Sequence, residues 1–333
     1  MGSDFILLAG DIGATKTNLS VCSREKGPRQ PIAEATFQSR DFSSLEALIK
    51  TFLARIDIQV HDACFGAAGP VLGGRIQVTN LPWLIDEESL KTELKLTAVY
   101  LLNDLEMIAH VVPHLEAPDV HTLNAGRTEP EGAIAVVAPG TGLGEAYLTW
   151  DGKRYRAHAS EGGHTDFSPG NALEIGLLSF MLERHPRVDF ERVCSGLGIP
   201  NIYAYLKQRG EDQEPPWLAG RLKQASDPTP VIFQAALDSE QPCALCIRTL
   251  EMFVSLLGAE AGNLALKVLA TGGVYLGGGI PPRILPALKE PRFLASFRNK
   301  DRLSKMLEQM PVHVILNPKA ALLGAAYRGL EAQ

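Results

Sequence analysis

The chain has 333 residues, of which 45% are hydrophobic and 21% are charged, and its formal net charge is −6 at pH 7. This balance excludes a disordered chain and is typical of a globular protein with room for two domains of ordinary size. The acidic charge argues against a general nucleic-acid binder and gives no reason to expect a membrane surface as partner. No apolar run approaches the ~20 residues of a spanning helix. The N-terminus also lacks the basic region of a signal peptide.

The cysteines indicate the compartment. An odd, scattered set predicts reduced thiols in a cytoplasmic protein. The five are Cys22, Cys64, Cys194, Cys243 and Cys246. The last two have redox or zinc spacing, but the surrounding pattern is helical and no second Cys/His pair lies nearby, so we expect no metal site there.

The chain opens with a strand, a glycine turn and a second strand. Residues 5–9 are apolar, residues 10–17 read GDIGATKT, and residues 18–22 alternate as a returning strand would. The turn lacks the glycine that a P-loop needs before its Lys-Thr pair, and no helix follows it. Backbone N–H groups and hydroxyls in such a turn can bind phosphate. A plain Asp/Gly hairpin is the alternative.

Residues 97–110 (TAVYLLNDLEMIAH) predict a buried strand that gives way to a helix at Asn103 or Asp104. A carboxylate there is held on rigid backbone beside the crevice at the strand's carboxyl end, where open α/β sheets bind ligands. A helix cap is the alternative reading, because Asn and Asp are favoured at caps. Further helices are expected over residues 43–55, 86–94 and 244–269, and strands over residues 62–68, 133–138 and 311–316.

The second half repeats the opening. A strand over residues 133–138 is followed by the turn PGTGLG at 139–144 and by an alternating strand at 145–150. Two strand–turn–strand units, one near the start of each half, predict two related domains that present their turns to a shared cleft.

Polar, glycine-rich segments follow. EGGHTDF (161–167) carries three titratable groups, and a satisfied polar turn is its alternative reading; zinc is not expected because Glu161 and His164 lack a matching pair. In ERVCSG (191–196), Glu191 reads equally as a first-turn helix acid. Residues 213–230 predict a surface excursion.

The C-terminal part supplies one more glycine-rich segment. Residues 271–283 predict a short strand, a triple glycine and prolines at a helix start, where a flat ring can approach bare backbone. A tight strand-to-helix turn is the alternative. The closing helix is expected to begin at Asn317 as cap and Pro318 as first residue.

Taken together, these segments resemble the bacterial glucokinase family of the hexokinase/actin-like ATPase superfamily. The resemblance runs from Gly10 to about Tyr327. Its carriers are GDIGATK (10–16), TNLPW (79–83), LLND (101–104), APGTGLG (138–144), EGGHTDF (161–167), ERVCSG (191–196) and GGGIPPR (277–283).

The resemblance implies an α/β, two-lobed actin-like ATPase (ribonuclease H-like) fold with a central interdomain cleft. The small domain would be residues 1–112 plus 317–333, and the large domain residues 113–316. The implied activity is ATP-dependent transfer of the γ-phosphate to the 6-hydroxyl of glucose, as the first step of glycolysis. Mg²⁺ would be needed, and a homodimer is expected.

The resemblance also implies roles for individual residues. Asp104 would be the catalytic base, and Asp11 would hold Mg²⁺ directly or through water. The sugar hydroxyls would be held by Asn103, Asp104, Glu161, His164 and Glu191. The first phosphate loop would be Gly10, Asp11, Ile12, Gly13, Ala14 and Thr15, and the second would include Gly140, Thr141 and Gly142 and extend to Gly144. Gly277, Gly278 and Gly279 would lie by the adenosine.

Two departures from the family pattern lie in the first loop. Ala14 stands where a second glycine is usual, and Lys16 stands where Asn is usual. Ala14 narrows the conformations open to the turn. Lys16 adds a cation that would either bind the γ-phosphate or point to solvent.

The sequence leaves three other functions open. A kinase for another hexose (mannose, fructose or an N-acetylated hexosamine) would share these motifs. A non-catalytic sugar-responsive regulator would be expected to carry a DNA-binding helix-turn-helix before the first loop, where only nine residues precede Gly10. A structural ATPase would leave Glu161, His164 and Glu191 without a purpose.

Overall fold

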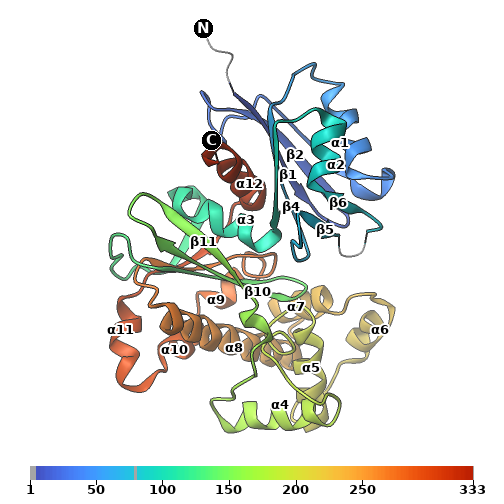
Figure 1. The fold of residues 1–333 in the computed structure, drawn as a ribbon. Helices are drawn as coiled ribbons and strands as arrows, with labels where there is room; N and C mark the ends of the chain where they lie inside the picture. Colours follow the sequence, from blue (N-terminus) through green and yellow to red (C-terminus); the bar gives the residue numbers. More distant parts are fainter. Residues whose placement is uncertain (1–4, 79–80, 333) are drawn as a thin grey trace. The chain divides into compact units, whose positions relative to one another are not determined.

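The structure, a computed structural model, describes residues 5–78 and 81–332. It divides into two compact units, Met1–Glu116 with Asn317–Gln333 and Ala117–Leu316, and each has its own sheet and core (Figure 1). Thr79 and Asn80 of the TNLPW motif lie outside the described residues. Among the helices that are described, none has both the length and the apolar character needed to cross a membrane.

The first unit is built on a mixed sheet with the order β3-β2-β1-β4-β7. Its strands are β1 (Ile6–Ile12), β2 (Lys16–Ser23), β3 (Ala33–Gln38), β4 (Asp62–Ala67) and β7 (Ala98–Asn103). β1, β2 and β3 are antiparallel neighbours, whereas β1, β4 and β7 run parallel. The carboxyl ends of β1, β4 and β7 therefore meet at one edge, which carries Asp11 and Asn103.

Helices cover both faces of this sheet. On one face α1 (Leu45–Leu53) and α2 (Glu87–Leu94) share a core with alternate strand residues such as Leu8 and Phe65. On the other, α3 (Asp104–Val111) and α12 (Ala320–Glu331) pack on Leu7 and Ala9. α3 and α12 cross closely, because a Cβ at Gly324 would lie 1.8 Å from the Met107 carbonyl oxygen. A short hairpin, β5 (Arg75–Gln77) and β6 (Leu84–Asp86), and two short helices, η1 (Ser39–Asp41) and η2 (Val112–His114), complete the unit.

The second unit repeats this strand arrangement. Its sheet has the order β11-β10-β9-β12-β13-β8, in which β9, β10 and β11 are antiparallel neighbours and β9, β12 and β13 run parallel. β8 adds an antiparallel edge. The bounds are β8 (Val120–Asn124), β9 (Ile134–Pro139), β10 (Leu143–Trp150), β11 (Tyr155–Ser160), β12 (Gly273–Leu276) and β13 (Val312–Ile315). The predicted internal repeat is therefore confirmed at the level of topology.

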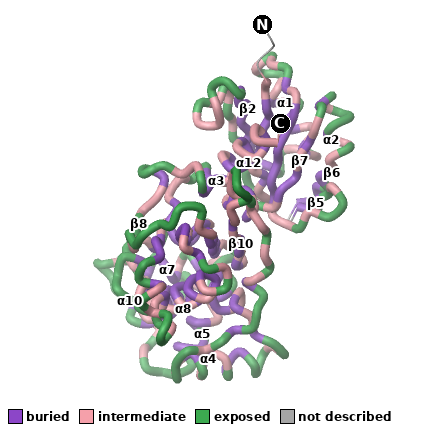
Figure 2. The backbone as a smooth tube through the Cα atoms, turned by 60° about the vertical axis from the view of Figure 1, so that its left-hand side comes forward, coloured by how far each residue is buried: buried purple, intermediate pink, exposed green. Residues whose placement is uncertain are grey.

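One long helix, α8 (Ala244–Val268), organises the helical part of the second unit. It packs against α5, α7 and α10, and the buried residues around it form the main core of the unit (Figure 2). Glycines bring α10 close, since Cβ atoms at Gly258 and Gly262 would lie 2.4 and 2.5 Å from the carbonyl oxygens of Phe293 and Phe297. The other α-helices are α4 (Ala172–Leu182), α5 (Gly198–Arg209), α6 (Pro216–Gln224), α7 (Thr229–Leu237), α9 (Leu285–Leu288), α10 (Pro291–Arg298) and α11 (Ser304–Gln309). Short η3 (Ala117–Asp119), η4 (Gly162–His164) and η5 (Asp301–Leu303) are also present.

Three local predictions were wrong. The first turn does not begin at Gly10, because β1 pairs with β2 as far as Ile12 opposite Thr17. The predicted surface excursion over residues 213–230 does lie mostly at the surface. It contains α6 and the start of α7, and prolines occupy the first turns of both helices.

The other two wrong predictions concern prolines near helix starts. Pro281 and Pro282 lie in a turn, and α9 begins only at Leu285. Asn317 does not cap the closing helix: its side-chain oxygen accepts the Lys319 N–H at 2.8 Å within a turn, and α12 begins at Ala320.

Candidate active site

The strand-to-helix junction of the first unit exposes one carboxylate. β7 ends at Asn103, whose side-chain oxygen accepts the Glu106 N–H at 2.6 Å and caps α3. Asp104 is the first helical residue, and its Oδ1 accepts the Leu105 N–H at 3.0 Å. Both readings of this junction therefore hold: Asn103 is the cap, and Asp104 stands beside it as an exposed residue whose carboxylate is partly shielded from water by the protein around it.

A second carboxylate lies near Asp104. Asp11, near the end of β1, faces Asn18 on β2, and the Asn18 side chain donates to Asp11 Oδ2 at 3.3 Å. Burial raises the pKa of Asp11; the Asn18 hydrogen bond lowers it and the charge of Asp104 raises it further. Desolvation likewise raises the pKa of Asp104, against the opposing effect of the Leu105 N–H. Two neighbouring carboxylates with raised pKa values favour a cation or a proton between them.

The first glycine turn is held in place by hydrogen bonds. Its turn proper, residues 13–15, is closed by the Gly13 N–H, which donates to the Lys16 carbonyl at 3.0 Å. Ser39 holds the turn through its hydroxyl, which donates to the Gly13 carbonyl at 2.7 Å, and through its N–H, which donates to the Thr15 carbonyl at 2.9 Å. Thr15 and Lys16 remain exposed at the tip.

Gly10 has a packing role in this region. It lies inside β1, where a Cβ would come within 2.6 Å of the Phe65 ring. Glycine is required at this position because the strand crosses a large buried side chain.

In the second unit the corresponding turn is braced by the segment that carries Glu191. The Leu143 N–H donates to Glu191 Oε2 at 3.0 Å. The Gly140 and Thr141 carbonyls accept the N–H groups of Gly196 and Leu197 at 2.8 and 3.1 Å. A Cβ at Gly142 would lie 2.4 Å from Glu191 Oε2, so only glycine fits there without moving that carboxylate.

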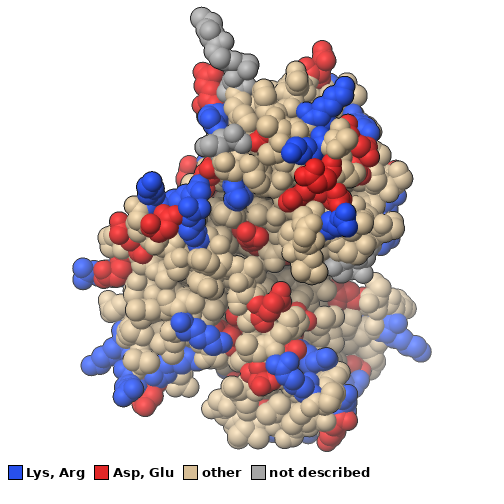
Figure 3. Space-filling view, viewed as in Figure 1, with Lys and Arg blue, Asp and Glu red and all other residues tan. Residues whose placement is uncertain are grey.

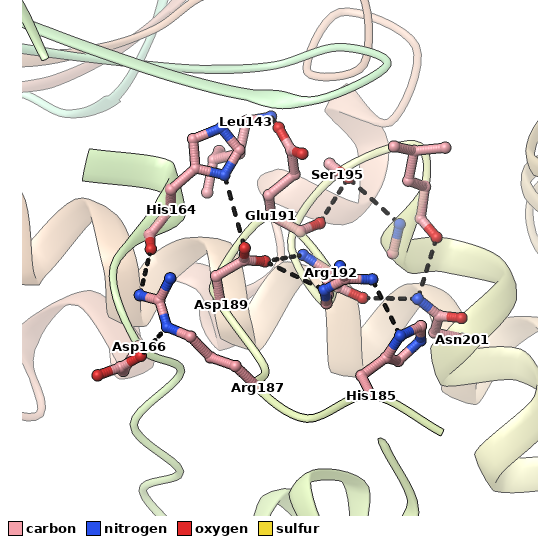
Figure 4. A network of polar contacts seen from close by, with 12 residues as sticks. Leu143, His164, Asp166, His185, Arg187, Asp189, Glu191, Arg192, Ser195 and Asn201 are labelled. Carbon is pink, nitrogen blue, oxygen red and sulfur yellow. Dashed lines mark hydrogen bonds and ion pairs between the residues drawn. The ribbon is translucent and has the colours of Figure 1, made fainter. Parts of the chain in front are cut away.

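His164 and Glu161 stand next to this turn. The Glu191 N–H donates to the Gly163 carbonyl at 2.8 Å and thereby joins the EGGHTDF and ERVCSG segments. His164 Nδ1 lies 3.5 Å from Asp189 Oδ2 (Figure 4). Its Nε2 lies 3.8 Å from Glu161 Oε2. The structure thus brings together Glu161, His164 and Glu191 within the second unit.

Asp189 is a further residue of this site, and the sequence did not predict it. Its carboxylate is 15% exposed, accepts the Arg192 N–H at 3.1 Å and lies against the His164 ring. A carboxylate in this position fixes the orientation of an imidazole. Nothing in its spacing marks Asp189 in the sequence.

A cavity of about 850 Å³ lies beside the second turn, within the second unit. Gly140 and Thr141 form one wall, and Gly279, Ile280 and Arg283 form another. The remaining lining comes from residues near Gly196 and from residues 226–237, including Leu197, Pro200, Thr229 and Phe233.

Glycines shape the wall formed by the GGGIPPR segment. Gly278 has φ +80°, and a Cβ there would lie 2.6 Å from the Pro139 carbonyl oxygen. A Cβ at Gly279 would meet no atom within 4 Å. The segment thus packs tightly on β9 at Gly278 and leaves open space at Gly279, as the approach of a flat ligand requires.

The surface charge does not mark this site. On the face seen in Figure 3, acidic and basic side chains are interspersed, without a broad field of one sign. An anionic ligand would therefore be recognised by local donors such as the turn N–H groups.

Two sheets of one topology, each with a glycine turn at its first hairpin and polar residues at its strand ends, define the two-lobed actin-like ATPase class to which sugar kinases belong. A family model described as Glucokinase matches residues 8–331. The glucokinase of Trichormus variabilis is 40% identical over 336 residues, covering 96% of this chain and 98% of the relative. The chain belongs to the glucokinase family.

Solved structures agree with this assignment. The crystal structure of a glucokinase from an Antarctic psychrotroph matches with a TM-score of 0.85 at 30% identity, over 98% of this chain and 99% of the other. The glucokinase of Balamuthia mandrillaris, solved in complex with glucose, shares the fold with a TM-score of 0.75 at 21% identity, over 98% and 94% of the two chains.

Proposed function

We propose that this member of the glucokinase family transfers the γ-phosphoryl group of ATP to the 6-hydroxyl of glucose and so forms glucose 6-phosphate. The observation that carries the proposal is the exposed carboxylate of Asp104 at the β7–α3 junction, close to Asp11 and on the same edge of the sheet. Phosphoryl transfer depends on positioning and charge stabilisation more than on covalent catalysis.

Asp104 is the general base of this proposal. It accepts the proton of the sugar's primary hydroxyl as that oxygen attacks the γ-phosphorus, and the bond to the β-phosphate oxygen of ADP breaks. Desolvation raises the pKa of Asp104, which makes its carboxylate a stronger base near neutral pH. Such assistance is typically worth ~10²–10⁴ in rate.

Four further residues would read the sugar hydroxyls. In the first unit, Asn103 uses its side-chain oxygen as a cap, so its amide nitrogen is the group that would donate to a hydroxyl. In the second unit, Glu161, His164 and Glu191 are joined by the contacts described above. A site built to pair hydroxyls rejects analogues that lack them, because its own polar groups would stay unpaired.

The phosphates would be bound by the two glycine turns. Gly13, Ala14 and Thr15 follow Asp11 and Ile12 in the first turn, with Gly10 acting through packing. Gly140, Thr141 and Gly142 supply the second turn. Backbone N–H groups and threonine hydroxyls at such turns would stabilise the charge on the phosphoryl oxygens.

Lys16 would add a positive charge to the first turn. On β2 it alternates with buried Thr17, and so it lies on the same sheet face as Asn18, the partner of Asp11. We place its ammonium group towards the γ-phosphate.

Asp11 fits the role of magnesium ligand. Mg²⁺ in kinases is bound by one or two carboxylates together with substrate phosphates. Burial is the main cause of the raised pKa of Asp11, and the charge of Asp104 adds to it; a cation held by Asp11, directly or through water, would offset both effects. When bound, Mg²⁺ would neutralise charge on the phosphates.

The adenosine would occupy the cavity of the second unit. Gly279 lines this cavity, and Gly277 and Gly278 precede it in the segment that a flat ring would approach. The exposed Leu197 and Pro200 add apolar lining to the same cavity. The Arg283 side chain at the rim would supply positive charge to the nucleotide.

The proposed activity also bears on the compartment, the pathway and the oligomeric state of the protein. We infer a cytoplasmic enzyme of glycolysis, since all five cysteines are free thiols, as in a reducing compartment. A homodimer is also proposed, on the family resemblance, and size-exclusion chromatography with light scattering tests it.

The decisive experiment measures ADP release with ATP and Mg²⁺ in the presence of glucose, in its absence, and with mannose, fructose or N-acetylglucosamine in its place. Turnover that requires glucose and is highest with it supports the proposal. A higher kcat/KM with another hexose would reassign the substrate, and sugar-independent or absent turnover would refute a hexose kinase.

A further inference from the structure

Two buried glutamates of the second unit have no part in the proposed chemistry. Glu145 follows Gly144 on β10 and is 1% exposed, and Glu260 on α8 is fully buried. The two carboxyl groups lie within hydrogen-bonding range of each other. Fully buried acids are rare unless they are paired or neutralised.

These carboxyl groups lack enough donors to be ionised together. Among the described groups, no N–H or O–H donor reaches Glu145 Oε1, Glu145 Oε2 or Glu260 Oε1. The Glu260 carboxyl has other contacts: the Asn263 side chain donates to Oε2 at 2.9 Å, and Lys267 Nζ lies 3.7 Å from Oε1. A single proton on Glu145, donated to Glu260, gives the pair the hydrogen bond that it otherwise lacks.

The Glu145 carboxyl also touches the EGGHTDF turn. A Cβ at Gly162 would lie 1.9 Å from Glu145 Oε2, so the backbone of Gly162 packs directly on that oxygen. Glu145 pairs with Ser160 across β10 and β11, and the Ser160 hydroxyl accepts the Gly162 N–H at 3.0 Å. The Glu145 carboxyl therefore lies directly against the turn that carries Glu161 and His164.

We propose that Glu145 is a positioning residue for sugar binding, whose carboxyl shares one proton with Glu260 and thereby holds the Glu161–His164 turn in its binding conformation. Loss of that proton to solvent leaves two adjacent buried carboxylates, and their repulsion displaces the turn that packs on them. This inference rests on the proposed role of Glu161 and His164 in holding the sugar.

The electrostatic surroundings agree with this assignment. Burial, together with the charge of Glu260 and the hydrogen bond with it, raises the pKa of Glu145 to about 8, and Lys267 opposes the shift. Among the described residues, the other ionisable groups that interact with the pair are Cys194, whose burial and acidic neighbours raise its pKa well above the usual value, and Lys300, which interacts with Glu260. The alkaline limit of sugar binding should therefore fall near pH 8.

The test measures the glucose Kd of the intact chain by isothermal titration calorimetry between pH 6.5 and 9.5. If only the protonated form binds, the Kd of the unsubstituted protein rises about tenfold between pH 7 and pH 9. Glu145→Gln, whose amide donates to Glu260 at every pH, should change less than twofold over this range. Glu145→Ala should bind weakly at all pH values, while kcat at saturating glucose changes far less than KM.

Glu174→Gln is the matched control. Glu174 is another buried glutamate of this unit, on α4, and accepts the Gly170 N–H at 2.6 Å. It should keep the alkaline rise in Kd, and circular dichroism should show all variants folded.

The inference is overturned if the unsubstituted protein shows no alkaline rise, or if Glu145→Gln shows the same rise. In either case glucose-dependent ADP release would persist, and the proposed function would stand. Absence of glucose binding at every pH would overturn both.

Discussion

Replacing Asp104 with Asn tests the proposed base with little disturbance to the structure around it. Asn is nearly isosteric, and its side-chain oxygen can accept the Leu105 N–H as Asp104 Oδ1 does at 3.0 Å. The amide cannot accept a proton from the sugar hydroxyl, so kcat should fall by ~10²–10⁴, which corresponds to ~3–5 kcal/mol in the barrier. The charge of Asp104 raises the pKa of Asp11, so its removal relieves repulsion and the melting temperature should not fall.

The assay couples ADP release to NADH oxidation, and calorimetry gives the glucose Kd of the same preparation. Glucose affinity should stay within about threefold, because hydrogen bonding to the sugar is kept while proton transfer is lost. Glu106→Gln is the control, as it removes a carboxylate from the same helix two residues away and should retain activity. Near-normal kcat in Asp104→Asn would refute the assignment of the base.

Three further predictions concern the second unit. Gly142→Ala places a methyl group 2.4 Å from Glu191 Oε2, so KM for both substrates should rise at least tenfold in steady-state assays. Unchanged KM values would contradict the role of Glu191 in holding the second glycine turn. Asp189→Asn weakens the contact with His164 and should raise the glucose KM several-fold with kcat within about threefold; a loss confined to kcat would contradict it. Folded Glu145 keeps its proton to about pH 8 and unfolded Glu145 loses it near 4.5, so the free energy of unfolding should fall with rising pH between these values by up to about 1.4 kcal/mol per unit. Urea unfolding at several pH values gives this free energy, which should fall less steeply with pH in Glu145→Gln than in the unsubstituted protein. An identical dependence on pH in the two proteins would contradict the buried proton.

The repeated topology was predictable because each sheet opens with a local pattern. A strand, a glycine turn and an alternating strand lie within about twenty residues, so the pairing of the two strands can be predicted from the sequence alone. The long helix was predictable for a similar reason, and the expected 244–269 differs from Ala244–Val268 by one residue. The strand-to-helix change at Asn103 was equally local.

The features that the sequence did not predict depend on packing between residues far apart in the chain. The sequence places Gly10 in a turn, but β1 continues past it because the turn closes only at Gly13. Glycine is required at position 10 because Phe65 on the neighbouring strand leaves no room for a Cβ. Asp189 reaches His164 only because the segment after α4 returns to the EGGHTDF turn. No spacing rule connects Glu145 with Glu260, since they meet across a sheet and a helix.

The central claim is that this chain moves a phosphoryl group from ATP to one particular hydroxyl of glucose. Carbon-13 NMR of the product formed from ATP, Mg²⁺ and carbon-13-labelled glucose tests it most directly, because coupling to phosphorus splits the signals of the esterified carbon and its neighbour. We expect a single sugar phosphate esterified at carbon 6, formed in equal amount to ADP. Esterification at another carbon, or ADP without any sugar phosphate, would contradict it.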